Sequence, residues 1–179
     1  MSIEHEIKIL EIDPKTIDQQ LRHLGAQYLG KKSFRRYVYD MKPATPDQWM
    51  RLRTDGTTTT LAIKHIVDPN SIDGTREREV AVDDFETTNT ILNKLWYEAK
   101  SYQENNRESY LLEDCEIEID HRPHIPPYLE IEWPSQNSVE HMIDTLGLSG
   151  HIHTSENTTE VYARYGIDDL VKQFPTLNF

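Results

Sequence analysis

The alternation of polar and apolar residues in many short segments constrains the fold of this chain more than any other feature. In segment 115–121, three acidic residues alternate with apolar ones, and segment 127–133 repeats the pattern around Glu130 and Glu132. Successive side chains of a strand point to opposite faces, so this period of two predicts strands with one charged and one apolar face. The strand candidates are 2–12, 34–41, 49–54, 59–66, 75–82, 108–112, 115–121 and 127–133, with a weaker one at 159–164.

A few segments have helical spacing instead. Asp13 suits an N-cap and Pro14 suits the first helical position, while Gly25 supplies a stop. Many short strands with few helices favour an α+β protein built mainly on an antiparallel sheet or barrel, rather than βαβ units. The helix candidates are 13–24, 85–96, 135–146 and a short one near 167–173.

Length and composition narrow the class of protein. The 179 residues fit one domain, 1–179, and the net charge of −12 argues against binding nucleic acid or an anionic membrane. Cys115 is the single cysteine, and the first residues lack the apolar core of a signal peptide. No run of about 18 apolar residues is present, the length that a membrane span needs. We therefore expect a cytoplasmic protein with no membrane partner.

On the charged faces of these strands, residues of like charge lie two positions apart. Glu4 and Glu6 share a face with Lys8, and Arg51 shares one with Arg53. Like charges two residues apart repel, so something must offset them. Divalent cations offset stacked acids and a polyanion offsets stacked bases, which predicts a site for a metal–polyphosphate complex. A barrel with this face inside and helices over its apolar outside satisfies the pattern. The alternative is a sheet whose charged face is merely solvated.

Several of these elements, taken in order, resemble the CYTH family, the triphosphate tunnel metalloenzymes. Glu4-x-Glu6-x-Lys8 is similar to the ExExK signature of that family. The resemblance extends to about residue 165. It implies a closed eight-stranded antiparallel barrel, or tunnel, with a charged interior, and a small-molecule triphosphate substrate bound with Mg²⁺ or Mn²⁺. The further matching elements are Arg51-x-Arg53, Lys64, Glu77-x-Glu79, Arg107, Asp120 and Glu130-x-Glu132.

The resemblance also implies a role for each matching residue. Glu4, Glu6 and Glu132 are expected to hold the metal that bridges the phosphates. Asp120 and Glu130 are expected to hold a second metal. Glu77 and Glu79 are expected to point into the substrate site. The residues expected to contact phosphate oxygens are Lys8, Arg51, Arg53, Lys64 and Arg107, of which Lys8 and Arg53 are the catalytic candidates.

The chain departs from the family pattern at three places, each expected to remove a positive charge. Thr75 and Asn105 stand where relatives carry Arg or Lys, and segment 158–162, expected as a strand, has no basic residue. Arg35 or Arg36 is a candidate to compensate.

Three functions therefore stay open. Hydrolysis of an inorganic, nucleoside or thiamine triphosphate is favoured. Cyclisation of ATP to cyclic AMP and pyrophosphate, as in class IV adenylyl cyclases, is the second reading, and non-catalytic binding of polyphosphate or nucleotide is the third. The pattern leaves homodimerisation open.

Overall fold

Antiparallel strands make up most of this protein. The structure is a computed structural model that describes residues 2–68, 71, 74–133 and 136–179. The strands in these ranges are β1 (Ser2–Leu10), β2 (Gln27–Asp40), β3 (Gln48–Thr54), β4 (Thr59–Ile66), β5 (Thr75–Val82), β6 (Ala99–Leu112), β7 (Cys115–His121), β8 (Tyr128–Trp133), β9 (Ile152–Thr154) and β10 (Thr176–Leu177). The helices are α1 (Pro14–His23), α2 (Phe85–Lys94), α3 (Gln136–Thr145), α4 (Thr158–Arg164) and α5 (Leu170–Gln173).

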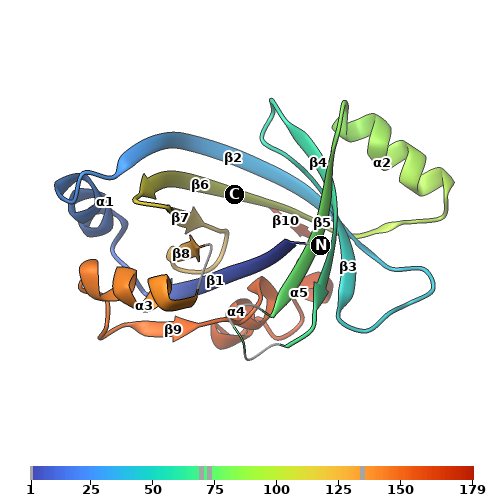
Figure 1. Ribbon diagram of the computed structural model, residues 1–179. Helices are drawn as coiled ribbons and strands as arrows, with labels where there is room; N and C mark the ends of the chain where they lie inside the picture. Colours follow the sequence, from blue (N-terminus) through green and yellow to red (C-terminus); the bar gives the residue numbers. More distant parts are fainter. Residues whose placement is uncertain (1, 69–70, 72–73, 134–135) are drawn as a thin grey trace.

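All ten of the strands in these ranges join one sheet, which curls strongly (Figure 1). Neighbours follow the order β10-β6-β2-β3-β4-β5-β1-β8-β7, β9 pairs with β1, and β6 also pairs with β7. Every pairing is antiparallel except that of β10 with β6. The expectation of an α+β protein built mainly on an antiparallel sheet is confirmed.

The resemblance implies a closed eight-stranded barrel, and this expectation is wrong. The sheet forms a strongly curled half-barrel. Among the residues that the structure describes, strand β1 pairs with β5 along Ser2–Glu4. From Lys8 to Leu10 the same edge of β1 pairs with the extra strand β9 instead. An edge that is occupied by β9 has no free backbone groups for β5. The contact that would complete a regular barrel is therefore confined to one end of β1.

The apolar faces of the strands lie under the helices. Helices α1 and α3 cover β1, β6, β7 and β8, where Ile117 and Ile131 are cross-strand partners in the core. Helix α2 packs near β3 over Leu52. Helices α4 and α5 enclose a third apolar cluster with Leu10 and Tyr128. No helix in the described ranges is long and apolar enough to cross a membrane. Because side chains alternate along each strand, the charged faces turn to the opposite, concave side of the sheet.

Most predicted elements are confirmed, and the differences have physical reasons. The four predicted helices are present, although residue 135, the predicted start of the third, lies outside the described residues. Strands β2 and β6 begin earlier than predicted. Their first halves are polar and lack alternation, so the sequence pattern did not indicate strands there. In the structure the two strands pair with each other along nearly their whole length. The short strands β9 and β10 were not predicted.

The predicted strand at 159–164 is wrong, since this segment is helix α4. The Asn157 side chain accepts hydrogen bonds from the backbone N–H groups of Thr159 and Glu160, and the Glu160 carboxylate accepts one from the Asn157 N–H. This capping box satisfies N–H groups that a helix start leaves without partners. Because this segment is a helix, its lack of a basic residue is not the loss of a basic residue from a final barrel strand.

The core packing of α1 gives a first prediction. Leu21 is 0% exposed in the core beneath α1, whereas Leu24 at the C-cap is 38% exposed. We expect Leu21→Ala to lower the free energy of unfolding by about 2–5 kcal/mol, because a buried cavity results. Leu24→Ala, the matched control, should change it by less than about 1 kcal/mol. Urea denaturation followed by circular dichroism measures both, and equal effects would contradict the packing.

Candidate active site

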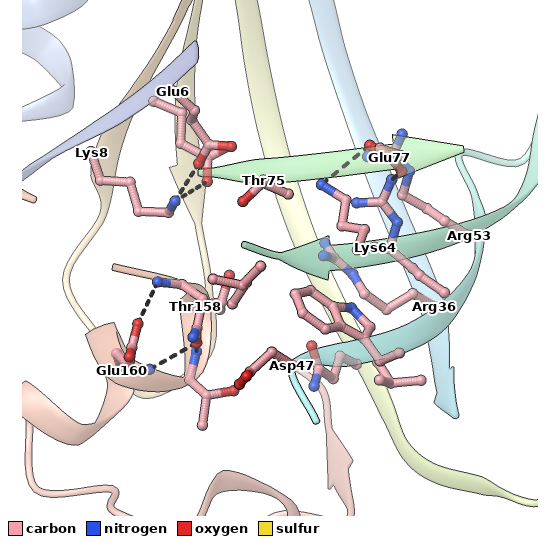
Figure 2. Close-up of a pocket in the computed structure, with 18 of the residues that line it drawn as sticks. Glu6, Lys8, Arg36, Asp47, Arg53, Lys64, Thr75, Glu77, Thr158 and Glu160 are labelled. Atoms are coloured by element: carbon pink, nitrogen blue, oxygen red, sulfur yellow. Dashed lines mark hydrogen bonds and ion pairs between the residues drawn. The ribbon is translucent and has the colours of Figure 1, made fainter. Parts of the chain in front are cut away.

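The charged faces of the strands meet around one cavity. Its volume is about 740 Å³, within the roughly 300–1,000 Å³ that is usual for small-molecule sites. Side chains from β1 to β8 and from the start of α4 line it. Figure 2 shows Arg36, Arg53, Lys64 and Glu77 on one side of the cavity, with Glu6 on the other. The half-barrel therefore gathers side chains that are far apart in the sequence.

A basic wall is formed by Arg51 and Arg53 of β3 and Lys64 of β4. Glu77 of β5 holds two of these cations, at 2.8 Å from Arg51 Nη2 and 3.3 Å from Lys64 Nζ. Glu79 holds Arg51 at 3.2 Å and Arg53 at 3.7 Å. The strand register places Lys64 directly opposite Glu77. Glu77 and Glu79 thus lie on the cavity side, as expected, and their contacts there are to the basic residues.

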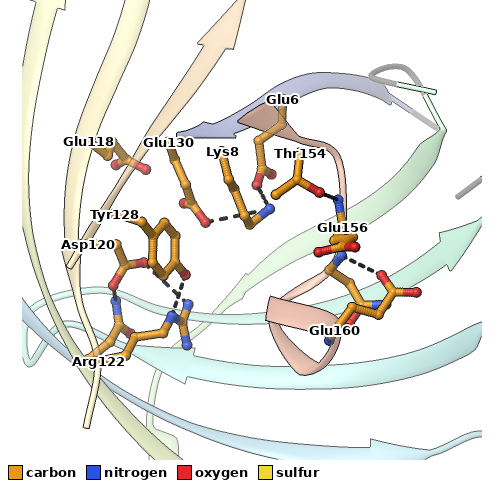
Figure 3. A network of polar contacts seen from close by, with 12 residues as sticks. Glu6, Lys8, Glu118, Asp120, Arg122, Tyr128, Glu130, Thr154, Glu156 and Glu160 are labelled. Atoms are coloured by element: carbon orange, nitrogen blue, oxygen red, sulfur yellow. Dashed lines mark hydrogen bonds and ion pairs between the residues drawn. The ribbon is translucent and has the colours of Figure 1, made fainter. Parts of the chain in front are cut away.

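Across the cavity, Lys8 lies between two carboxylates of β1 and β8 (Figure 3). Its ammonium group donates a hydrogen bond to Glu6, and Glu130 Oε1 is 3.8 Å away. Burial disfavours the charged form of Lys8, but Glu6 and Glu130 outweigh it and raise the pKa of Lys8. Lys8, which lines the cavity, is consequently held there as a cation.

Arg107 of β6 is the centre of a buried network. Its guanidinium contacts Glu118, Asp120 and Glu130, with Nη2 at 2.7 Å from Asp120. Burial disfavours its charge, yet these acids raise the pKa of Arg107 well above its usual value. Burial, together with Glu130 and Asp120, also outweighs Arg107 and raises the pKa of Glu118 to about 7. Lys8, at 3.8 Å from Glu130, and Arg122, at 3.3 Å from Asp120, add further positive charge, so the acids of this network share more than one cation.

Several lining residues were not predicted as site residues. Arg36 was named only as a candidate to compensate for missing charge, and it lines the cavity, whereas Arg35 turns outward to Glu86 at 3.3 Å. The sequence offered a signal for Glu116 and Glu118, because the alternation in segment 115–121 places them on the same face as Asp120. Trp49 had no such signal, since an aromatic residue on a strand is usually core. The unpredicted lining residues that are charged or aromatic and lie on the strands that carry the predicted site include Trp49, Glu116 and Glu118, and Arg122 lies just after β7.

The carboxylates of β1, β7 and β8 fit part of the metal expectation. Glu132 lies opposite Glu6 on one side and opposite Glu116 on the other. Burial, and then Glu6 and Glu116, raise the pKa of Glu132, so this row has excess negative charge. Carboxylate oxygens of this kind suit Mg²⁺ or Mn²⁺. Glu6 and Glu132 therefore fit as ligands of a divalent cation.

Of the other predicted ligands, Asp120 and Glu130 are already paired with a cation. The side chain of Glu4 lies outside what the structure describes. Asp120 and Glu130 already accept hydrogen bonds from Arg107. Across the residues whose side chains are described, no group of three or more His, Cys, Asp or Glu is arranged to hold a metal. The second metal site stays a prediction.

Comparison with known proteins establishes the fold. No protein-family model and no curated protein sequence matches this chain. Among solved structures, the PH1012 protein from Pyrococcus horikoshii superposes with a TM-score of 0.73 at 19% identity, over 82% of this chain and 92% of that one. A candidate adenylate cyclase from Vibrio parahaemolyticus has a TM-score of 0.65 at 12% identity, over 92% and 89% of the two chains.

A candidate adenylyl cyclase from Hippeastrum, HpAC1, described as having a dominant triphosphatase activity, has a TM-score of 0.62 at 14% identity, over 93% of this chain and 96% of that one. At such identities the likeness concerns the fold alone. The chain shares with these solved structures the mainly antiparallel fold that the resemblance to the triphosphate tunnel family implies. The resemblance to that family is therefore confirmed at the level of the fold.

The network around Arg107 gives a second prediction. Arg107→Gln removes the cation shared by Glu118, which is half-buried, and by Asp120 and Glu130, which are buried, so we expect the free energy of unfolding to fall by about 3–5 kcal/mol. Arg164→Gln is the control, because the pair of Arg164 with Glu156 is largely exposed and should contribute at most about 1 kcal/mol. Urea denaturation measures both variants. A loss below 1 kcal/mol for Arg107→Gln would show that the network does not stabilise the fold.

Proposed function

We propose that this protein is a divalent-metal-dependent hydrolase of a triphosphate-containing substrate. The observation that carries the proposal is the opposition of two walls across one cavity. Arg51, Arg53 and Lys64 form the basic wall, and Glu6 and Glu132 form the carboxylate wall. A linear polyphosphate lying between the walls would meet cations on one side and metal-binding oxygens on the other. Of common metabolites, the triphosphates combine these two requirements.

The basic wall accounts for substrate binding. Arginine contacts phosphate oxygens in a bidentate manner, and lysine supplies a compact charge. Glu77 and Glu79 hold these side chains at the cavity surface before substrate binds, which reduces the entropy lost on binding. In the proposal, phosphate oxygens replace part of these carboxylate contacts. Glu77 and Glu79 then act mainly by positioning the cations.

Lys8 accounts for stabilisation of charge during the reaction. Its raised pKa keeps it a cation, and its place beside Glu130 fixes where that charge lies. Preorganised donors in a partly buried site stabilise charge that develops in a transition state. Arg53 would act in the same way from the opposite wall. A divalent cation bound by Glu6 and Glu132 would supply Lewis-acid chemistry and lower the pKa of a bound water.

Cyclisation of ATP is the second candidate. It is favoured by the fold shared with candidate adenylyl cyclases from Vibrio parahaemolyticus, Bacillus halodurans and Hippeastrum. The same walls would bind the triphosphate, and a ribose hydroxyl would attack the α-phosphorus and release pyrophosphate. A cavity of about 740 Å³ has room for a nucleoside as well as the phosphates.

A substrate panel tests the reaction. Tripolyphosphate, ATP and thiamine triphosphate are each incubated with Mg²⁺ or Mn²⁺, and the products are identified by chromatography. We expect metal-dependent release of phosphate from at least one of them, stopped by EDTA. Cyclic AMP with pyrophosphate would establish the second candidate instead. Tight binding without any product would leave a polyphosphate-binding protein and refute hydrolysis.

Two substitutions test the walls. We expect Glu6→Gln, which removes a proposed metal ligand, and Lys8→Gln, which removes a cation that stabilises developing charge, each to lower kcat about 10²–10³-fold. Glu98→Gln and Lys15→Gln, on exposed residues outside the cavity, make the same charge changes and should leave kcat unchanged. Circular dichroism confirms folding. Full activity in folded Glu6→Gln or Lys8→Gln would contradict the assigned roles.

A further inference from the structure

The wall formed by β2 and β6 differs from the rest of the cavity in charge. The inward residues of β6 before Arg107 are neutral, buried and polar: Ser101, Gln103 and Asn105. Arg36 of β2 lies opposite Gln103 on one side and opposite Arg53 on the other. It is 8% exposed, and its guanidinium points into the cavity (Figure 2). Arg36 therefore places a buried cation beside neutral residues, whereas Asp40 and Lys100, which also line the cavity from β2 and β6, pair with each other.

The contacts of Arg36 set it apart from the other arginines of the cavity. Arg51, Arg53, Arg107 and Arg122 each have a carboxylate within 4.0 Å. For Arg36 no carboxylate lies within that distance among the residues that the structure describes. Its Nη2 donates a hydrogen bond to Asn105 Oδ1, and its Nε, like those of Arg51 and Arg107, is buried without a partner in the same set.

The neighbours of Arg36 make this arrangement costly. Burial, and then the positive charges of Arg122, Arg51 and Arg53, lower the pKa of Arg36 well below its usual value. Asp120 acts in the opposite direction but is outweighed. A buried cation without a counter-ion destabilises a fold, and a protein rarely keeps one without a ligand to offset it. A phosphoryl group would neutralise the charge and accept two hydrogen bonds from the guanidinium.

We propose that Arg36 is a phosphate-binding residue and forms, with the cavity face of β6, an anion subsite that takes one phosphoryl group of a polyphosphate. Asn105 is the hydrogen-bond partner of Arg36, so positions 36 and 105 reach the same space from adjacent strands. The subsite supplies from β2 the positive charge that β6 lacks at Asn105. The identity of the anion rests on the proposed function, whereas its binding at Arg36 does not require turnover.

A structural role is the competing explanation. Asn105 Nδ2 donates to Asp120 Oδ1 at 2.8 Å, so Arg36 also fixes the amide that positions Asp120. A residue needed for this purpose would stabilise the protein in the absence of ligand. A residue kept for anion binding would not, because its unpaired charge opposes folding. The stability of the ligand-free protein therefore separates the two roles.

The test measures tripolyphosphate and pyrophosphate binding by isothermal titration calorimetry in EDTA and again with Mg²⁺. We expect Arg36→Gln to raise the Kd for tripolyphosphate about 10- to 100-fold, as for loss of a charge-assisted hydrogen bond. Arg36→Lys should recover part of the affinity. Arg35→Gln is the matched control, with the same charge change one residue away on the outer face, and should bind like the unmodified protein. The Tm of ligand-free Arg36→Gln should be unchanged or higher.

Relocating the charge tests the geometry. In the double variant Arg36→Gln with Asn105→Lys, a cation enters the same space from β6, and we expect most of the affinity to return. A folded double variant that binds no better than Arg36→Gln contradicts the subsite. A lower Tm for Arg36→Gln, with no recovery of binding in Arg36→Lys, assigns Arg36 a structural role and overturns the proposal.

The outcomes also separate this proposal from the proposed function. If the unmodified protein binds tripolyphosphate tightly through Arg36 but releases no product, hydrolysis fails and the subsite stands. If it hydrolyses a triphosphate and Arg36→Gln binds and turns over equally well, the subsite fails and hydrolysis stands. If the unmodified protein binds neither tripolyphosphate nor pyrophosphate, the subsite is overturned.

Discussion

Ion pairing between neighbouring strands is the interaction on which the rest of this structure depends. A sheet that turns its charged face inward must offset the loss of hydration of every charge there. The strand register does this by placing Lys8 opposite Glu130 and Lys64 opposite Glu77. Arg107 shares its charge among three carboxylates. The helices then need only cover the apolar side, which is why one curled sheet with helices on its outside suffices.

This neutralisation is incomplete in two places, and they lie on different walls. Glu132 has carboxylates on both neighbouring strands, and burial with these acids raises the pKa of Glu132. Burial, and then the charges of neighbouring arginines, lower the pKa of Arg36. One place has excess negative charge and the other excess positive charge. A metal–polyphosphate complex brings the opposite charge to each, which is the physical link between the fold and the proposed chemistry.

The sequence predicted the parity of the strands well, because one residue type per face is a local property. It therefore predicted that Lys64, Glu77 and Glu79 share the cavity with Arg51, which the structure places together. It failed where local pattern and global pairing diverge. Segment 159–164 alternates weakly, but it belongs to helix α4, which a capping box of Asn157 and Glu160 begins. The ion pairs of Asp120 and Glu130 with Arg107 depend on three strands meeting, which no single segment encodes.

The divided edge of β1 has a mechanical consequence. Within the described residues Ser2–Glu4 connect β1 to β5, and Lys8–Leu10 on the same edge pair with β9. The two halves of the curled sheet, β2–β5 and β1 with β8, are thus joined on this side by three residue pairs that lie next to the predicted metal-binding acids. Such a short seam opens at a lower cost in backbone hydrogen bonds than a full-length pairing. The width of the cavity on this side therefore depends on these few backbone hydrogen bonds, whereas the pairing of β1 with β8 keeps Glu6, Glu130 and Glu132 in register.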